Sequence, residues 1–215
     1  MLRFNKPKDL GVTYTQKDLE NMDKQLGLTV EKIKGTDSNK IEETLTFEGS
    51  KIIVGTFSNA EVTAQINRAS EYWKYTPLRQ MQVKSNPDGT AEASGILDIK
   101  KLKGFIAYFG YSSADLDKGL EYINATNLTH FPIYFKGKGS ITNNQVTLEL
   151  QLVEVYGFAL PSDVTKQAEV GLVAITESVI SKVGSSKTQI EKLELKDEKA
   201  YLKVEIPERI KAVAE

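Results

Sequence analysis

FSNAEV, residues 57–62, is typical of the start of an α-helix. The Ser58 hydroxyl can accept a hydrogen bond from a free backbone N–H of the first turn, and the Glu61 carboxylate can accept one from the Ser58 backbone. Phe57 and Val62 occupy the two positions of a hydrophobic staple. The stretch therefore predicts a helix that begins after Ser58.

The same order of aromatic, hydroxyl, acidic and aliphatic residues recurs at residues 14–19 and 111–116. It predicts two further helices, which begin after Thr15 and Ser112. Because capping boxes are common, a chance recurrence is the alternative. Three starts in one chain favour an architecture of repeated units.

A pair of alternating strands follows each predicted helix. A fourth helix, without the acid of the capping box, is predicted from Ser162 to Gly184, with apolar residues at 164, 168, 171, 175, 179 and 183. Its own strand pair comes after it. The four predicted hairpins join residues 44–47 to 52–54, 80–84 to 90–98, 133–141 to 146–152, and 190–195 to 201–206.

These elements predict an α+β fold of four helix-then-hairpin units, each of roughly 45 to 55 residues. We expect the hairpins to share an antiparallel sheet that the helices cover on one face. The chain is then a single domain over 1–215, or two similar halves at about 12–105 and 106–210 with two units each.

Composition narrows the classes of function. The formal net charge is −1, with acids and bases interspersed, which argues against a nucleic-acid binder. The absence of cysteine excludes disulfides, thiolate metal sites and cysteine nucleophiles. No apolar run is long enough to span a bilayer, and Met1 is not followed by the apolar core of a signal peptide. The chain as given is expected to be soluble, although an anchor or signal could have been removed.

No catalytic, metal or cofactor motif stands out. His130 is the single histidine, so neither a serine triad nor a histidine-rich metal site can be assembled. Residues 137–140 lack the spacing of a phosphate loop, and residues 86–89 fit a turn better than a calcium loop. We therefore expect no cofactor, no metal and no enzymatic activity; a hydrolase that works with acids alone is the remaining alternative.

Residues 100–111 mix lysines with an aromatic cluster. As a helix this segment could lie on an anionic membrane surface, or it could pack into the core with its lysines in water. Residues 73–75, just before Pro77, are open to the same two interpretations, core anchor or ligand platform. The candidate ligand-binding residues are Trp73, Tyr75, Phe105, Tyr108 and Phe109.

The segment 153–161 combines a strand, a glycine, Leu160-Pro161 and a following amphipathic helix. It resembles the YpmS-like group of membrane-anchored extracytoplasmic proteins of Gram-positive bacteria, and residues 57–67 are similar to the helix that opens such domains. The resemblance implies a cell-envelope location and a non-catalytic role in contact with lipid. It supplies no catalytic residue. The group's membrane anchor is missing from this chain, and the unit at Tyr14 has no counterpart.

The sequence therefore favours a non-enzymatic, lipoprotein-like binding or structural domain of the cell envelope. We expect it to hold a lipid or other apolar ligand between helices and sheet, with a membrane surface or another envelope protein as partner and no nucleic acid. The alternative is a protein-protein interaction module whose apolar faces close on one another and leave no space for a small molecule.

Overall fold

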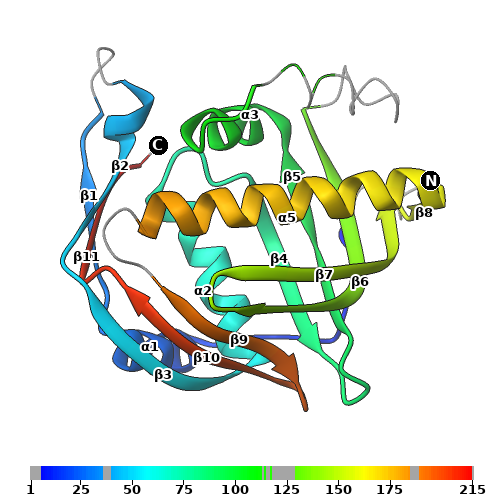
Figure 1. The fold of residues 1–215 in the computed structure, drawn as a ribbon, viewed down its shortest axis with the longest axis horizontal. Coiled ribbons are helices and arrows are strands. Elements are labelled where there is room, and N and C mark those ends of the chain that lie inside the picture. Colours follow the sequence, from blue (N-terminus) through cyan, green and yellow to red (C-terminus); the bar gives the residue numbers. More distant parts are fainter. Residues whose placement is uncertain are drawn as a thin grey trace.

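A computed structural model describes residues 6–35, 40–112, 114, 117, 129–184 and 189–214 as an α+β fold. The fold class expected from the sequence is confirmed (Figure 1). The elements are α1 (Gln16–Leu26), β1 (Thr29–Ile33), the 3-10 helix η1 (Ile41–Thr44), β2 (Leu45–Glu48), β3 (Lys51–Ser58), α2 (Asn59–Tyr72), β4 (Leu78–Ser85), β5 (Ala91–Asp98), α3 (Ile99–Tyr108), β6 (His130–Thr142), β7 (Gln145–Val155), β8 (Phe158–Ala159), α5 (Ser162–Gly184), β9 (Ile190–Lys196), β10 (Lys199–Ile206) and β11 (Arg209–Val213).

The larger sheet is antiparallel throughout and has the strand order β3-β10-β9-β6-β5-β4, with β7 and then β8 on the other side of β6. Strand β6 is long enough to join its two parts. Residues 130–137 of β6 pair with β5, whereas residues 140–142 pair with β9.

The smaller sheet has the order β1-β11-β2. Its central strand, β11, pairs in parallel with β1 and antiparallel with β2. In the larger sheet, β3 pairs with β10, which is also far from it in the sequence. Strands from residues 12–105 and from 106–210 therefore pair with one another in the larger sheet, and the smaller sheet brings β11 between two strands of the first half.

The helix starts at Thr15 and Ser58 are confirmed. The Thr15 N–H and hydroxyl both donate to the Asp18 carboxylate, at 2.7 Å each, and α1 begins at the next residue. The Ser58 hydroxyl accepts from the Glu61 N–H at 3.2 Å, and the Ser58 N–H donates to the Glu61 carboxylate at 2.8 Å. The helix expected after Ser112 lies mainly outside the described residues.

The first of the four predicted hairpins is wrong. β2 and β3 do not pair, because Gly49 and Ser50 carry the chain from one sheet to the other. Gly49 has a φ of 68°, which suits glycine. The hairpins β4-β5, β6-β7 and β9-β10 are confirmed, and the β6-β7 turn places Asn143 and Asn144 at positive φ. Strands β1 and β11 were not predicted.

Helix α1 packs on the inner face of β3 and β10. Met22 and Leu26 of α1 are buried against Ile53 and Phe57 of β3 and Val204 of β10. Burial of these side chains supplies the apolar contacts that fix α1 on the sheet.

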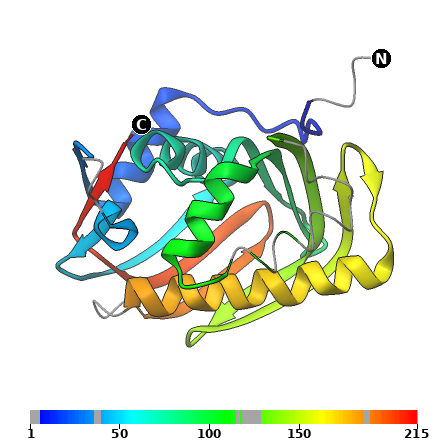
Figure 2. The same cartoon turned by 90° about the horizontal axis from the view of Figure 1, so that it is seen from above.

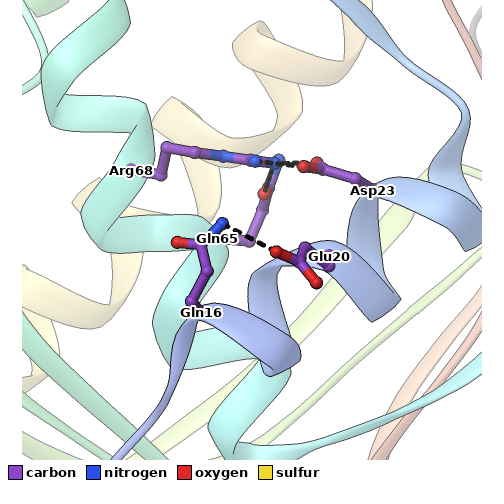
Figure 3. Close-up of polar contacts among 5 residues, drawn as sticks. All are labelled: Gln16, Glu20, Asp23, Gln65 and Arg68. Carbon is purple, nitrogen blue, oxygen red and sulfur yellow. Dashed lines mark hydrogen bonds and ion pairs between the residues drawn. The ribbon is translucent and has the colours of Figure 1, made fainter.

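Polar contacts tie α1 to α2 (Figure 3). The Arg68 guanidinium of α2 donates to both carboxylate oxygens of Asp23 on α1 and also to the Gln65 amide oxygen. A two-point contact of this kind fixes orientation as well as distance. It therefore holds the two helices at a defined angle.

Helix α2 lies along the outer edge of β4 and satisfies its backbone. Asn67 donates from its amide nitrogen to the Met81 carbonyl and accepts from the Met81 N–H through its amide oxygen, both at 2.8 Å. Thr63 and Asn59, one and two turns earlier, make the same pair of contacts with Val83 and Ser85, at 2.9 to 3.5 Å. Three side chains spaced four residues apart thus replace a neighbouring strand.

Replacing Asn67 by alanine would leave the Met81 N–H and C=O without partners. We expect Asn67→Ala to lower the free energy of unfolding by about 2 to 4 kcal/mol, because each unpaired backbone group costs about 1 to 3 kcal/mol. Urea denaturation measures this loss, and amide exchange at Met81 should accelerate. Glu71→Ala, at an exposed position of the same helix, is the matched control and should change stability by less than about 0.5 kcal/mol. Equal effects of both variants would contradict the edge role of Asn67.

Candidate functional site

The five candidate residues meet in one aromatic cluster. The Trp73 ring centroid lies 5.7 Å from that of Tyr75, 5.8 Å from Phe105, 5.0 Å from Tyr108 and 6.3 Å from Phe109. Their arrangement is edge-on or tilted, as aromatic rings prefer. The sequence thus identified side chains that are neighbours in space.

Packing within the molecule accounts for this cluster. Trp73, Tyr108 and Phe109 are only 6%, 3% and 7% exposed. The Trp73 ring N–H donates to the Thr44 hydroxyl at 3.2 Å, and the Tyr108 hydroxyl donates to the Leu45 carbonyl at 2.6 Å. Burial raises the pKa of Tyr108 to about 12. The rings therefore form the core in which α2, α3, η1 and β11 meet, and the polar atoms of Trp73 and Tyr108 have partners there.

Tyr75 packs directly on Gly104 of α3. A methyl group at residue 104 would overlap the Tyr75 ring, whereas a methyl group at Gly171 of α5 would meet no atom. Glycine at position 104 is therefore needed for the approach of the ring, despite its cost in a helix.

The same substitution should consequently have opposite effects at these two glycines. Gly104→Ala should destabilise the protein by about 1 to 3 kcal/mol through overpacking. Gly171→Ala should stabilise it by about 0.5 to 1 kcal/mol, because alanine favours the helix. Thermal unfolding of both variants measures the two changes, and destabilisation by Gly171→Ala would show that α5 is packed more closely than described.

A cavity of about 680 Å³ that is bordered by charged residues adjoins the aromatic cluster. Tyr75 lines it together with four lysines, and the Asp98 carboxylate at its side accepts the Lys101 N–H at 3.0 Å, which caps α3. Another of the lysines, Lys103, pairs with Asp117 at 2.7 Å. The lining lysines are Lys74, Lys100, Lys101 and Lys103. Several polar groups of this cavity are thus already engaged within the chain.

A second cavity, of about 370 Å³, lies between α5 and the inner face of the large sheet. Figure 1 shows α5 crossing this face. The inward-facing residues are Leu78, Met81 and Val83 of β4, Ala91 and Ala93 of β5, Ile133, Phe135, Gly137, Gly139 and Ile141 of β6, Val146, Leu148 and Leu150 of β7, Leu193 and Leu195 of β9, and Leu172 and Thr176 of α5. The lining is almost wholly apolar.

The cavity exists because the side chains beneath α5 are short. The inner face carries Ala91 and Ala93 on β5 and Gly137 and Gly139 on β6. The register places Ala91 directly beside Gly137, whereas Ala93 pairs with Phe135 and Gly139 follows the part of β6 that pairs with β5. Alternate residues of a strand share a face, so the four small residues form one shallow floor. Longer side chains from β4, β7 and β9 form the walls.

Helix α5 is attached near both ends. Near its start, the Glu169 carboxylate accepts the Leu150 N–H of β7 at 2.9 Å. In its second half, the Ser178 hydroxyl donates to the Phe109 carbonyl at 2.8 Å, and Lys182 donates to the Tyr108 carbonyl. Figure 2 shows the helix as a long outer layer on this side of the molecule. Leu172 and Thr176, between the attachments, face the cavity.

The most buried face of α5 differs from the predicted one. The sequence favoured the apolar line that includes Val164, Ala168 and Ile175, but these residues are only half-buried. Thr165, Glu169 and Ile180 are the buried residues. The physical reason is the hydrogen bond that the Glu169 carboxylate accepts from the Leu150 N–H at the edge of β7, because it turns the Glu169 side of α5 toward the sheet.

Stability should depend on pH through Glu169. The Lys166 ammonium and the Leu150 N–H hold the pKa of Glu169 below its ordinary value of 4.5. The charged carboxylate therefore stabilises the fold above pH 4.5, and this contribution is lost as the pH falls through the lower folded-state pKa. We expect Glu169→Gln to destabilise the protein at about pH 7, and the destabilisation measured by urea denaturation should shrink as the pH falls below 4.5. A difference independent of pH would contradict the ionised contact.

The described residues hold no group of three or more His, Asp or Glu side chains suited to a metal ion. His130 begins β6, is exposed, and has its Nδ1 atom 3.0 Å from the Thr129 hydroxyl. No helix in the described ranges is both long and apolar enough to cross a membrane. Comparison with protein-family models, curated proteins and solved structures finds no match for this chain.

Proposed function

We propose that this protein is a non-enzymatic binding domain that holds a lipid or other apolar ligand between α5 and the large sheet. The observation that carries the proposal is the apolar cavity of about 370 Å³ under the helix. Its volume falls in the range of about 300 to 1,000 Å³ that is usual for small-molecule sites.

The exposure of the lining supports a ligand. Leu148, Leu150 and Leu193 point inward, yet all three are only half-buried. The buried core clusters around α1 and at Trp73 share no residue with the lining. The cluster around Ile99 and Phe131 shares Leu78, Ile133 and Phe135 with it. An apolar ligand would remove the inner leucines from water, and each square ångström so buried contributes about 25 cal/mol.

The carboxylates near the cavity support a role without catalysis. Glu92 accepts the Tyr134 hydroxyl at 2.6 Å and the Asn86 amide at 3.0 Å. Glu169 is bound to the β7 backbone. Both acids thus serve the fold, whereas a hydrolase that uses acids needs a carboxyl group free to reach its substrate.

An envelope location belongs to the same proposal. The segment 153–161, which carries the resemblance to extracytoplasmic proteins, comprises the end of β7, strand β8 and the residues that lead into α5. It therefore positions the helix that covers the cavity. A lipid or membrane surface is the partner that such a domain would meet there, and an envelope protein is the other.

The alternative is a protein-protein interaction module. Ile52 and Val54 on the outer face of β3 are 70% and 73% exposed, and apolar side chains of this kind are suited to a protein interface. That alternative needs no ligand in the cavity, so ligand binding separates the two functions.

A cavity-filling variant tests the proposal. Ala93→Leu places a larger side chain on the cavity floor and should weaken the binding of a fluorescent fatty acid at least about tenfold, while stability is kept or raised. Thr56→Leu adds a leucine on the exposed outer face of β3 and is the matched control. Titration of the probe and native mass spectrometry measure binding. If the wild type takes up no probe and carries no lipid, the proposed function is wrong.

A further inference from the structure

We propose that the occupant of this cavity is a single unbranched hydrocarbon chain, whose polar end remains in water. This inference rests on the proposed function and specifies the class of ligand. Its basis is the size of the cavity, its length along β6 and the state of its polar groups.

The volume suits one chain of moderate length. A methylene group is similar in size to a water molecule, which occupies about 30 Å³ of liquid, so about 370 Å³ accommodates roughly a dozen methylene groups. A lipid with two long chains could insert one of them, and the second would stay outside.

The shape is elongated. The lining extends from Met81 of β4 across β5 and β6 to Leu193 of β9, which are successive neighbours in the sheet. Strands β5 and β9 both pair with the same side of β6, so the long dimension of the cavity runs along β6. The lining of β6 extends over the eight steps from Ile133 to Ile141, which at about 3.3 Å per residue gives a length of about 26 Å. Spread over that length, the volume of about 370 Å³ gives a mean cross-section of roughly 14 Å². A cross-section of this size is narrow for a fused ring system, and it suits one extended hydrocarbon chain.

The inner surface offers no free polar group to a ligand within the described lining. The Thr176 hydroxyl donates to the Leu172 carbonyl at 2.7 Å, and the Glu92 carboxylate is held by Tyr134 and Asn86. Lys138 and Ser140 of β6 and Thr147 of β7 alternate with the inward-facing residues of their strands, so they belong to the opposite face of the sheet. A polar head placed inside would lose its hydration without compensation, which excludes it from the cavity.

A homologous series of ligands tests this inference. Fatty acids of about six to eighteen carbons and the corresponding alcohols are titrated into the full chain, below their micellar concentrations. The dissociation constant should fall about fourfold for each added methylene and level off near about twelve carbons, because further carbons lie outside. An acid and an alcohol of equal length should bind within about threefold of each other, since the head stays in water.

Ala93→Leu provides a second measurement that does not depend on absolute affinity. Its side chain adds three carbons to the floor, so the length at which affinity levels off should shorten by about three carbons. Thr56→Leu should leave that length unchanged.

The outcomes separate this inference from the function on which it rests. Failure of every apolar compound to bind would overturn both. Binding of a sterol or a polycyclic hydrocarbon that fatty acids do not displace would overturn the inference and leave the function standing. A difference of more than about tenfold between acid and alcohol of one length would also overturn it, because a headgroup site would then be present.

Discussion

Backbone groups at the edges of the large sheet must find hydrogen-bond partners, and the arrangement of helices follows from this requirement. Helix α2 supplies Asn59, Thr63 and Asn67 to the edge of β4. Helix α5 supplies Glu169 to the edge of β7. These polar contacts hold α2 beside β4 and attach α5 to β7, from which α5 crosses the inner face. A space remains beneath α5 because short side chains lie there.

Local signals in the sequence were sufficient for the elements whose partners are near in the chain. The caps at Thr15 and Ser58 and the hairpin with Asn143-Asn144 depend on residues within a few positions of one another. The partner of β3 is β10, far along the chain, and β11 lies between β1 and β2. Local sequence patterns do not show which distant strands will pair. For this reason strands β1 and β11, and the separation of β2 from β3, were not predicted.

The candidate site also combines features that nearby residues predict with features that depend on distant strand pairing. Large aromatic side chains gather wherever apolar surface is buried, so finding Trp73 and Tyr108 together indicated a core as readily as a ligand platform. The cavity depends on residues that attract little notice, namely the small side chains at Ala91 and Ala93 and at Gly137 and Gly139. Their alternation in two strands that pair was the available signal. This signal can be interpreted only once the register between β5 and β6 is known, because the register places these small residues on the same face of the sheet.

The place of β11 in the small sheet has a consequence for biosynthesis. Strands β1 and β2 do not pair with each other; each is paired to β11, which is synthesised after every other strand that the structure describes. The N-terminal strands must wait, unpaired, through translation of the intervening residues, and β3 waits likewise for β10. Assembly thus depends on contacts between distant segments, a topology that slows folding and gives chaperones a period in which to act.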